Sequence, residues 1–388
     1  MKYKVESLVV KIANVCNLNC SYCYVFNLGD EHYVDIPNKM SEELCDQLLF
    51  RIKEHCLEHR LNRFVIIFHG GEPLILGIPY YENFLAKAEK LFRDTHIHLG
   101  YVMQSNGTLM TDKWAKFLTD NKIHVGFSID GYESIHNQNR VYRSNGRGSY
   151  QDVIKGINIY RKYQPNIDVL SVLNTDADPE LFYQTIKDLK LHSLGLLFRD
   201  HNYNDIECVD FEKTTEWAIR LFDLWFDDKE KGGLKVLTPF TTLINLLLGM
   251  EWVGNDAYGE VMNNALLILS NGEIQVTGVE KPSKDTKAYF LQENKLNEVF
   301  KKKIFRDYYN LHQERNLCEQ CLNCLIRPIC GGGRYSHRFS KENGFNNPTI
   351  YCDTMKRLVV HIQNRVYETL PEELKEKTQL QMLCYEEL

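Results

Sequence analysis

Short hydrophobic runs and amphipathic stretches alternate along the first two hundred residues. The hydrophobic runs are bounded by turn residues and are the length of buried strands. The stretches between them repeat apolar residues at helical spacing, and the first begins at Ser41, a residue typical of a helix start. Strands alternating with helices predict an α/β fold with a parallel sheet, which we interpret as a partial (β/α)6 barrel of the TIM type. The six predicted strands are 7–14, 63–68, 99–107, 124–131, 167–174 and 194–199.

The alternation ends near residue 209. A long amphipathic helix is expected there, and residues 239–250 form a second helical stretch. Residues 265–278 are typical of a hairpin, with Asn-Gly at its turn, and 354–370 of a C-terminal helix. We therefore expect three parts, namely a barrel over 1–208, a bridging region over 209–317 and a smaller cysteine-rich domain with C-terminal helices over 318–388.

Composition narrows the class of protein. Hydrophobic residues make up 44% and charged residues 25% of the 388 positions, as in globular proteins. A formal net charge of -6 disfavours a nonspecific nucleic-acid binder. No apolar run reaches the roughly 18 residues of a membrane span, and no signal peptide is recognisable. We expect a cytoplasmic protein, in which twelve partly clustered cysteines indicate metal binding or catalysis rather than disulfides.

Unusual loops follow four of the predicted strands. They are the cysteine loop after 7–14, His-Gly-Gly-Glu-Pro after 63–68, Ser-Asn-Gly after 99–104 and Ser-Ile-Asp-Gly at 128–131. Parallel barrels bind ligands at the carboxyl ends of their strands. The coincidence predicts one shared site.

Cys16, Cys20 and Cys23 form a set of three soft ligands. Three thiolates can bind three irons of a [4Fe–4S] cluster and leave the fourth iron open for a small molecule. Zinc is the rival, but a structural zinc site needs a fourth ligand, and the nearest histidine, His32, lies outside the tight loop. The spacing favours the open cluster.

This CxxxCxxC loop, with aromatic Tyr22 before its last cysteine, resembles the radical S-adenosylmethionine (SAM) superfamily. The resemblance implies that the amino and carboxylate groups of SAM chelate the open iron. It also implies that reductive cleavage of SAM releases a 5′-deoxyadenosyl radical, which abstracts a hydrogen atom from the substrate. The protein positions the substrate and excludes water.

Other loops match the SAM contacts of that family. Gly70, Gly71, Glu72 and Pro73 resemble the motif that binds the SAM amine, with glycines that permit close approach of the backbone to a ligand. Arg140 resembles an arginine that holds the SAM carboxylate, a task suited to a guanidinium. The matching positions that face the ribose or adenine, for which turn formation is the alternative role, are Ser105, Asn106, Ser128, Asp130 and, more weakly, Asn174.

A second cysteine group lies between 318 and 352. Its ligand types suit either a cluster or zinc. The segment resembles the SPASM domain of radical SAM peptide-modifying enzymes, which carries auxiliary [4Fe–4S] clusters. The resemblance assigns the four ligands of one auxiliary cluster to Cys321, Cys324, Cys330 and Cys352. Cys318 is an additional thiol, which either replaces one of these four ligands or is free.

The chain also departs from the full SPASM pattern. No cysteine occurs from 209 to 317, and Arg334 stands where a further cluster ligand is expected. We therefore predict one auxiliary cluster and two clusters in all. Relatives that mature sulfatases carry an aspartate base beside the hairpin, where this chain has Thr277 and Gly278, so the sequence identifies no base.

Residues 330–339 and 344–352 resemble a narrower group, maturases that install three-residue cyclophanes in ribosomally made peptides. Tyr335, His337 and Arg338 either line a substrate channel or pack the cluster domain, and we favour packing. The resemblance implies an oxidoreductase that forms a C–C crosslink between a side-chain carbon and an aromatic ring, using an auxiliary cluster as electron acceptor. The alternatives are sulfatase maturation to formylglycine, thioether formation or epimerisation. The expected partners are a precursor peptide and a flavodoxin- or ferredoxin-type reductant.

Overall fold

The computed structural model describes residues 3–27, 32–250, 257–276, 288–378 and 380–387. The chain separates into two compact units. Unit 1 consists of residues 1–170 and 264–309, and unit 2 of residues 171–263 and 310–388. These discontinuous units differ from the three consecutive parts expected from the sequence, which remain a prediction.

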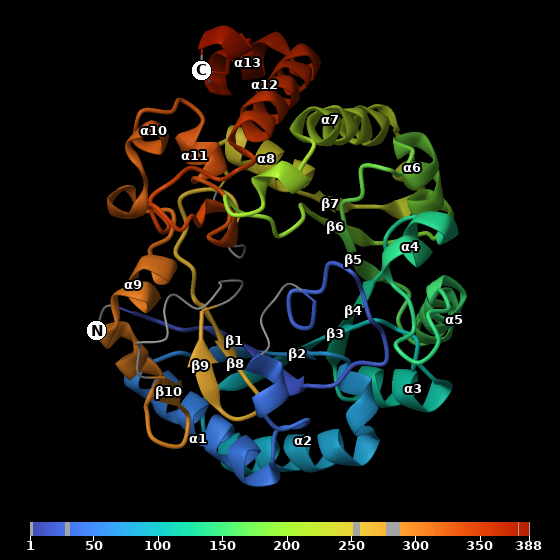
Figure 1. The fold of residues 1–388 in the computed structure, drawn as a ribbon, viewed down its shortest axis with the longest axis vertical. Coiled ribbons are helices and arrows are strands. Elements are labelled where there is room, and N and C mark those ends of the chain that lie inside the picture. Colours follow the sequence, from blue (N-terminus) through green and yellow to red (C-terminus); the bar gives the residue numbers. More distant parts are fainter. Residues whose placement is uncertain (1–2, 28–31, 251–256, 277–287, 379, 388) are drawn as a thin grey trace. The chain divides into compact units, whose positions relative to one another are not determined.

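Unit 1 is built on a sheet whose strand order is β10-β9-β8-β1-β2-β3-β4-β5 (Figure 1). Strands β8 and β1 to β5 are parallel, whereas β9 and β10 are antiparallel to their neighbours. The strands are β1 (Ser7–Ala13), β2 (Arg63–Gly70), β3 (His98–Ser105), β4 (Ile123–Ser128), β5 (Asp168–Val172), β8 (Ala265–Ile268), β9 (Glu273–Gln275) and β10 (Tyr289–Phe290).

Helices connect the parallel strands of unit 1 and lie outside β1 to β4 in Figure 1. Ser41 caps the first helix, because its side chain accepts a hydrogen bond from the Leu44 N–H at 3.2 Å. The same helix ends at Arg60 in the left-handed conformation. The helices are α1 (Glu42–His59), α2 (Ile78–Phe92), α3 (Asp112–Asp120), α4 (Glu133–Asn139), α5 (Tyr150–Arg161) and α9 (Lys303–Tyr309).

The predicted strand–helix alternation is confirmed, and the partner of the hairpin is new. Strand β8 pairs in parallel with β1, placing Val10 beside Ile268. The hairpin thus extends the sheet of unit 1 and is not separate from the barrel strands. Hydrophobic periodicity identifies a strand but does not identify its neighbour, which explains why the pairing was not predicted.

Unit 2 contains the short parallel pair β6 (Ser193–Leu197) and β7 (Val236–Thr238). The sequence did not predict β7, because three residues carry too little alternation to be recognised. The helices of this unit are α6 (Pro179–Asp188), α7 (Phe211–Asp227), α8 (Phe240–Leu247), α10 (Glu319–Leu322), α11 (Arg327–Cys330), α12 (Cys352–Thr369) and α13 (Glu372–Thr378).

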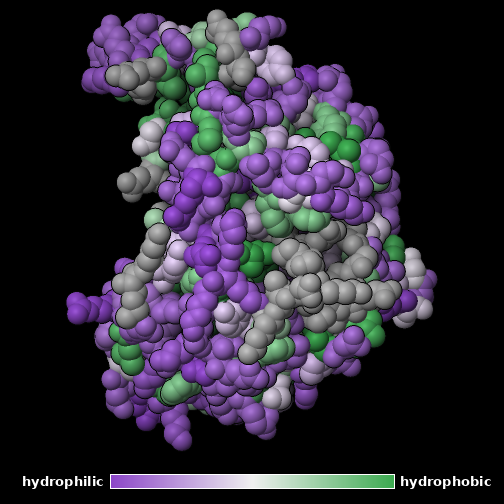
Figure 2. All heavy atoms as spheres, turned by 60° about the vertical axis from the view of Figure 1, so that its left-hand side comes forward, coloured by the Kyte–Doolittle hydropathy of each residue, from purple (hydrophilic) through white to green (hydrophobic). Residues whose placement is uncertain are grey.

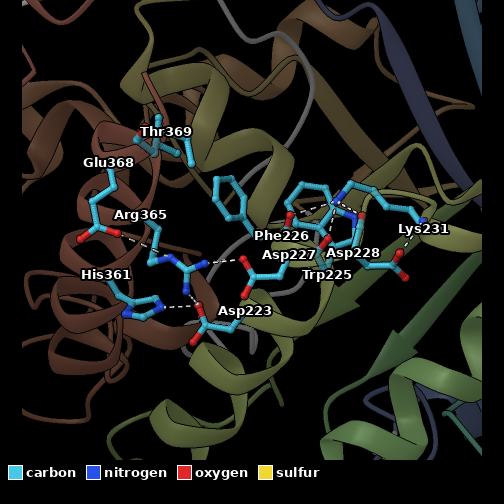
Figure 3. A network of polar contacts seen from close by, with 11 residues as sticks. Asp223, Trp225, Phe226, Asp227, Asp228, Lys231, His361, Arg365, Glu368 and Thr369 are labelled. Carbon is cyan, nitrogen blue, oxygen red and sulfur yellow. Dashed lines mark hydrogen bonds and ion pairs between the residues drawn. The ribbon is translucent and has the colours of Figure 1, made fainter. Parts of the chain in front are cut away.

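Helices α7 and α12, both expected from the sequence, are joined by a polar network (Figure 3). Arg365 of α12 donates to Asp223 at 2.8 Å and to Asp227 at 2.5 Å. The side chain of His361, one turn earlier on α12, bonds the same Asp223 at 2.8 Å. Two helices that are far apart in sequence are thereby aligned side by side, with Phe222 of α7 in the buried core.

Polar side chains cover most of one face of the molecule (Figure 2). On the face in Figure 2, hydrophilic side chains predominate and hydrophobic ones form small groups. Within the described part of the chain, no helix combines the length and the apolar character required to cross a bilayer.

Candidate active site

Two glycines at the end of β2 let it approach the strand that leads into the cysteine loop. Gly70 has a φ of 127°, and a Cβ there would lie 2.0 Å from the carbonyl oxygen of Ala13. A Cβ on Gly71 would lie 2.1 Å from the carbonyl oxygen of Val15. From the sequence, these glycines were expected to let the backbone approach a ligand. In the structure they let β2 approach the chain's own backbone.

The loop that carries Cys16, Cys20 and Cys23 is anchored at both ends. The Cys23 N–H donates to the Cys20 carbonyl at 3.0 Å, which closes a tight turn. The Asn19 N–H donates to the Val141 carbonyl at 2.8 Å. All three thiols are partly exposed and lie on one short loop after β1. The structure thus holds the three predicted ligands on a fixed backbone.

The environment of Cys16 and Cys20 favours the protonated form of their thiols. Burial raises the pKa of Cys16 to about 12, although the Leu18 N–H, 3.4 Å from its sulfur, acts in the opposite direction. Burial also raises the pKa of Cys20 to about 11, and the Arg140 guanidinium partly opposes this effect. Iron binding must therefore displace protons from the thiols, as expected for ligands that coordinate only as thiolates.

Glu72 is a buried carboxylate, 1% exposed, with three donors. It accepts from the Leu74 N–H at 3.0 Å, the Ser105 hydroxyl at 2.9 Å and the Asn106 N–H at 2.7 Å. Burial raises the pKa of Glu72 to about 7, although these hydrogen bonds lower it. Glu72, Ser105 and Asn106 thus form one cluster in which Ser105 orients the carboxylate. Their predicted contacts with SAM remain a prediction.

Asp130 and Arg140 form a buried ion pair with an Nε–Oδ2 distance of 2.8 Å. The Tyr22 hydroxyl donates to the same carboxylate, and the guanidinium lies 5.4 Å from the centre of the Tyr22 ring. Burial alone would raise the pKa of Asp130, but the charge and hydrogen bond of Arg140, together with His136 and the Tyr22 hydroxyl, outweigh it, and the net pKa is lowered. Arg140 also interacts with Cys20. Three predicted SAM contacts therefore surround a predicted cluster ligand.

The remaining predicted contacts occupy different places. Ser128, at the end of β4, accepts from the Gln104 amide at 2.9 Å. Pro73 starts a short 3-10 turn, and its carbonyl accepts from the Tyr81 hydroxyl at 2.9 Å. Asn174 lies in unit 2, where its side chain accepts from the Asp176 N–H at 3.0 Å, as in a turn.

Sequence reasoning missed a polar chain around Asn106. The Asn106 amide donates to the Asn17 side chain at 2.9 Å and lies 3.8 Å from the Cys16 sulfur. Asn17 in turn donates to the Thr108 hydroxyl at 2.8 Å. The position of Asn17 inside the cysteine loop was the available signal for this role. This series of hydrogen bonds links the loop after β3 to Cys16, the first predicted iron ligand.

The second cysteine group gathers within unit 2 from separate elements. Cys318 and Cys321 lie at the start and inside of α10, and Cys330 is the last residue of α11. Cys324 lies in the turn between these helices, and Cys352 begins α12. Burial raises the pKa of Cys352, and the nearby Lys356 charge acts in the opposite direction.

The thiols of this group lie close enough to affect one another's pKa. Burial raises the pKa of Cys330 to about 12, and Cys352 and Cys324 also raise it. Burial likewise raises the pKa of Cys321, with a further contribution from Cys318. The assignment of four ligands, with Cys318 as an extra thiol, remains a prediction.

The donor sets suit iron–sulfur clusters. Each set offers thiols only, the ligands that iron–sulfur clusters use. Across the described residues, no three histidine, cysteine, aspartate or glutamate side chains converge as needed for one metal ion.

Residues after the glycine segment have distinct roles. The Tyr335 ring stacks on Phe345 with a centroid separation of 3.8 Å, and Arg338 is 1% exposed, so both pack as favoured from the sequence. His337 instead lines a cavity of about 90 Å³ beyond the ends of β6 and β7. Its Nε2 lies 3.3 Å from Asp200, which also faces Arg334 at 3.7 Å. Thr277 and Gly278, examined as the site of a base, lie outside the described residues.

Comparisons with known proteins agree with this site. The family model "Radical SAM superfamily" matches residues 10–189, which include the three-cysteine loop and the Glu72 and Arg140 clusters. Two similar proteins are anaerobic sulfatase-maturating enzymes. The serine-type enzyme of Bacteroides thetaiotaomicron is 31% identical over 87% of this chain and 85% of its own length. The cysteine-type enzyme of Clostridium novyi is 26% identical over 90% and 93%.

Solved structures resemble the fold. The structure described as native anSMEcpe with bound AdoMet has a TM-score of 0.80 and 24% identity, covering 93% of this chain and 98% of that one. The same protein with AdoMet and the Kp18Cys peptide has a TM-score of 0.78 and 23% identity, covering 93% and 98%. The predicted fold class is therefore confirmed.

Proposed function

Because this chain belongs to the radical SAM superfamily, we propose that it is a peptide maturase that oxidises a serine or cysteine side chain to the aldehyde of formylglycine. The similarity to serine-type and cysteine-type sulfatase-maturating enzymes carries the proposal, since it covers 87% and 90% of the chain, respectively. This reaction was the alternative in the sequence analysis. It now takes precedence over cyclophane formation, which the comparisons do not support.

The chain's own residues support SAM binding in unit 1. Cys16, Cys20 and Cys23 would hold one cluster, and the second cysteine group another. When bound, the first cluster would supply the electron for SAM cleavage and the second would accept the electron of the substrate radical. Glu72 offers a buried acceptor for the SAM ammonium. Arg140, fixed by Asp130, offers a guanidinium for the SAM carboxylate.

The proposed oxidation balances as two one-electron steps. A Cβ–H bond of the peptide residue breaks, and its hydrogen atom passes to the carbon radical derived from SAM. The substrate radical then loses one electron and one proton. Serine yields the aldehyde directly, whereas cysteine yields a thioaldehyde that water converts to the aldehyde with release of hydrogen sulfide. A flavodoxin- or ferredoxin-type protein would supply the reducing electron.

Cyclophane formation is a second candidate, supported by one feature of the chain. The sequence from 209 to 317 contains no cysteine, so the ligands available suit one auxiliary cluster. The Cys-Gly-Gly-Gly motif that resembles cyclophane maturases lies beside that cysteine group. Both candidates begin with hydrogen abstraction at Cβ. They differ in the fate of the substrate radical, which is oxidised to an aldehyde in the first reaction and forms a C–C bond to an aromatic ring in the second.

The test is an anaerobic assay with the reconstituted protein, SAM and dithionite. The substrates are the Kp18Cys peptide, its serine counterpart, and peptides encoded by short reading frames near the gene. We expect a product of the Cys or Ser peptide that reacts with a hydrazide reagent. A crosslinked peptide, lighter by two hydrogens and unreactive to hydrazide, would instead establish cyclophane formation and overturn the first proposal.

A further inference from the structure

A buried arginine lies beside the second cysteine group without a carboxylate partner. Arg338 is 1% exposed, and it heads the fully buried side chains when these are ranked by volume. Every hydrogen bond of its guanidinium goes to a backbone carbonyl. In the described residues, no aspartate or glutamate forms an ion pair with it. Carbonyl dipoles solvate the cation but leave its full positive charge inside the protein.

The glycine segment 331–333 provides most of these carbonyls. Nε donates to Gly332 at 2.8 Å, and Nη2 donates to Gly331 at 2.8 Å and to Gly333 at 3.1 Å. Nη1 completes the cage through the carbonyl of Leu311 at 3.2 Å and that of Asn316 at 3.5 Å.

Only glycine fits this cage. All three glycines have φ between 62° and 85°, the left-handed region in which a Cβ is strained. A Cβ on Gly332 would lie 2.5 Å from Nη2 of Arg338 itself. The triple glycine thus wraps the backbone around the guanidinium, which gives this motif a physical purpose beyond a tight turn.

The groups that interact electrostatically with Arg338 are thiols and one phenol. Burial lowers the pKa of Arg338, and the negative charges that Cys321, Cys330, Tyr335 and Cys318 carry when deprotonated act in the opposite direction. The Gly332 N–H also donates to the Cys330 sulfur, while the Gly332 carbonyl accepts from Arg338. Gly332 therefore connects the guanidinium, through its carbonyl, to a predicted cluster ligand, through its N–H.

We propose that Arg338 is the fixed counter-charge of the auxiliary cluster and that its glycine cage raises the reduction potential of that cluster. A cluster with thiolate ligands is anionic, and reduction makes it more so, so a buried cation favours the reduced state. The N–H bond to the Cys330 sulfur acts in the same direction. The inference rests on the auxiliary-cluster part of the proposed function and needs neither the identity of the peptide nor a particular reaction.

The test measures the auxiliary cluster alone. In full-length protein with C16A, C20A and C23A, only the second cysteine group can hold iron. The midpoint potential of the reconstituted protein is measured by redox titration monitored by electron paramagnetic resonance. Arg338→Gln keeps hydrogen-bond donors and removes the charge, whereas Arg338→Lys keeps the charge and loses the planar fork. The assay contains no SAM and no peptide, so it is independent of the substrate assay.

Arg338→Gln should lower the equilibrium constant for reduction of the auxiliary cluster at least tenfold, which corresponds to a fall of about 59 mV in midpoint potential for a one-electron couple. Arg338→Lys should stay much closer to the parent. An unchanged potential in R338Q, or an equal fall in R338K, would overturn the proposal. If R338Q folds but takes up no iron, iron uptake by R338K supports the counter-charge role. Failure of both variants to fold would assign Arg338 to packing and contradict it.

Discussion

Neutralising Asp130 should destabilise the site around Arg140 strongly. The pair is buried, with side-chain exposures of 2% for Asp130 and 9% for Arg140, and its atoms are 2.8 Å apart. In Asp130→Asn the amide can still accept from the Tyr22 hydroxyl and from Arg140, so the change removes mainly charge. Two charges at 4 Å and an effective dielectric constant of 20 attract by about 4 kcal/mol. Breaking a buried pair on one side costs about 3–5 kcal/mol.

The assay is hydrogen exchange of amides in β4 and α4, which flank Asp130. Local opening that is easier by about 3 kcal/mol speeds exchange by roughly a hundredfold or more. The pKa of Asp130 is lowered from 3.8, so the carboxylate is ionised throughout the neutral range. Its stabilising effect is present above the unfolded pKa and is lost as pH falls below it. The difference between D130N and the parent should therefore be constant from pH 6 to 8.

The control is the double variant D130N/R140M. Removing both charges eliminates the unpaired guanidinium, so most of the protection should return. Exchange in D130N that matches the parent would refute the reasoning. So would a double variant that exchanges faster than D130N, because the cost would then not come from an uncompensated charge.

Three further predictions concern other parts of the chain. Since burial raises the pKa of Glu72 to about 7, the affinity for SAM, measured by anaerobic calorimetry, should increase roughly tenfold from pH 6 to 8. The variant E72Q should bind SAM weakly and show no such pH dependence. The same pH dependence in E72Q would exclude Glu72 as the ammonium acceptor. Gly71→Ala should reduce the iron content toward about four atoms per chain, because the added Cβ collides with the Val15 backbone. The control G100A, whose Cβ meets the Val65 side chain at 3.6 Å, should keep about eight iron atoms. Equal iron contents in the two variants would contradict the argument from the backbone. Arg365→Met should lower the free energy of local α12 opening by less than about 1 kcal/mol in exchange measurements, since its side chain is 27% exposed; a larger loss would show the network of Figure 3 to be a principal support of α7 and α12.

Periodicity predicted most of the elements that carry the site. The strands before the cysteine loop and before Glu72 are long and apolar, so their ends, and the ligands that follow them, could be located from sequence. Residue types also predicted the ligands of a second cluster, since soft ligands at short spacing have few other uses, and this assignment stays a prediction. The contact between Asp130 and Arg140 was not predicted, because each was assigned separately to a ligand.

Side-chain partnerships and strand order required the structure. Nothing in a short hairpin sequence indicates that Ala265–Ile268 pairs with the first strand. The purpose of three consecutive glycines was also hidden, because their partner Arg338 is several residues away and an arginine is expected at the surface. Strand pairing and the contacts of a buried arginine depend on packing and electrostatics, which the local sequence pattern does not reveal.

The most direct test of the account is SAM cleavage by the triple variant C16A/C20A/C23A. Under dithionite, the reconstituted parent should bind about eight irons and form 5′-deoxyadenosine. The triple variant should keep about four irons in the second cysteine group and form none. Continued formation of 5′-deoxyadenosine by the triple variant would contradict the assignment of these three cysteines as the ligands of the SAM-cleaving cluster.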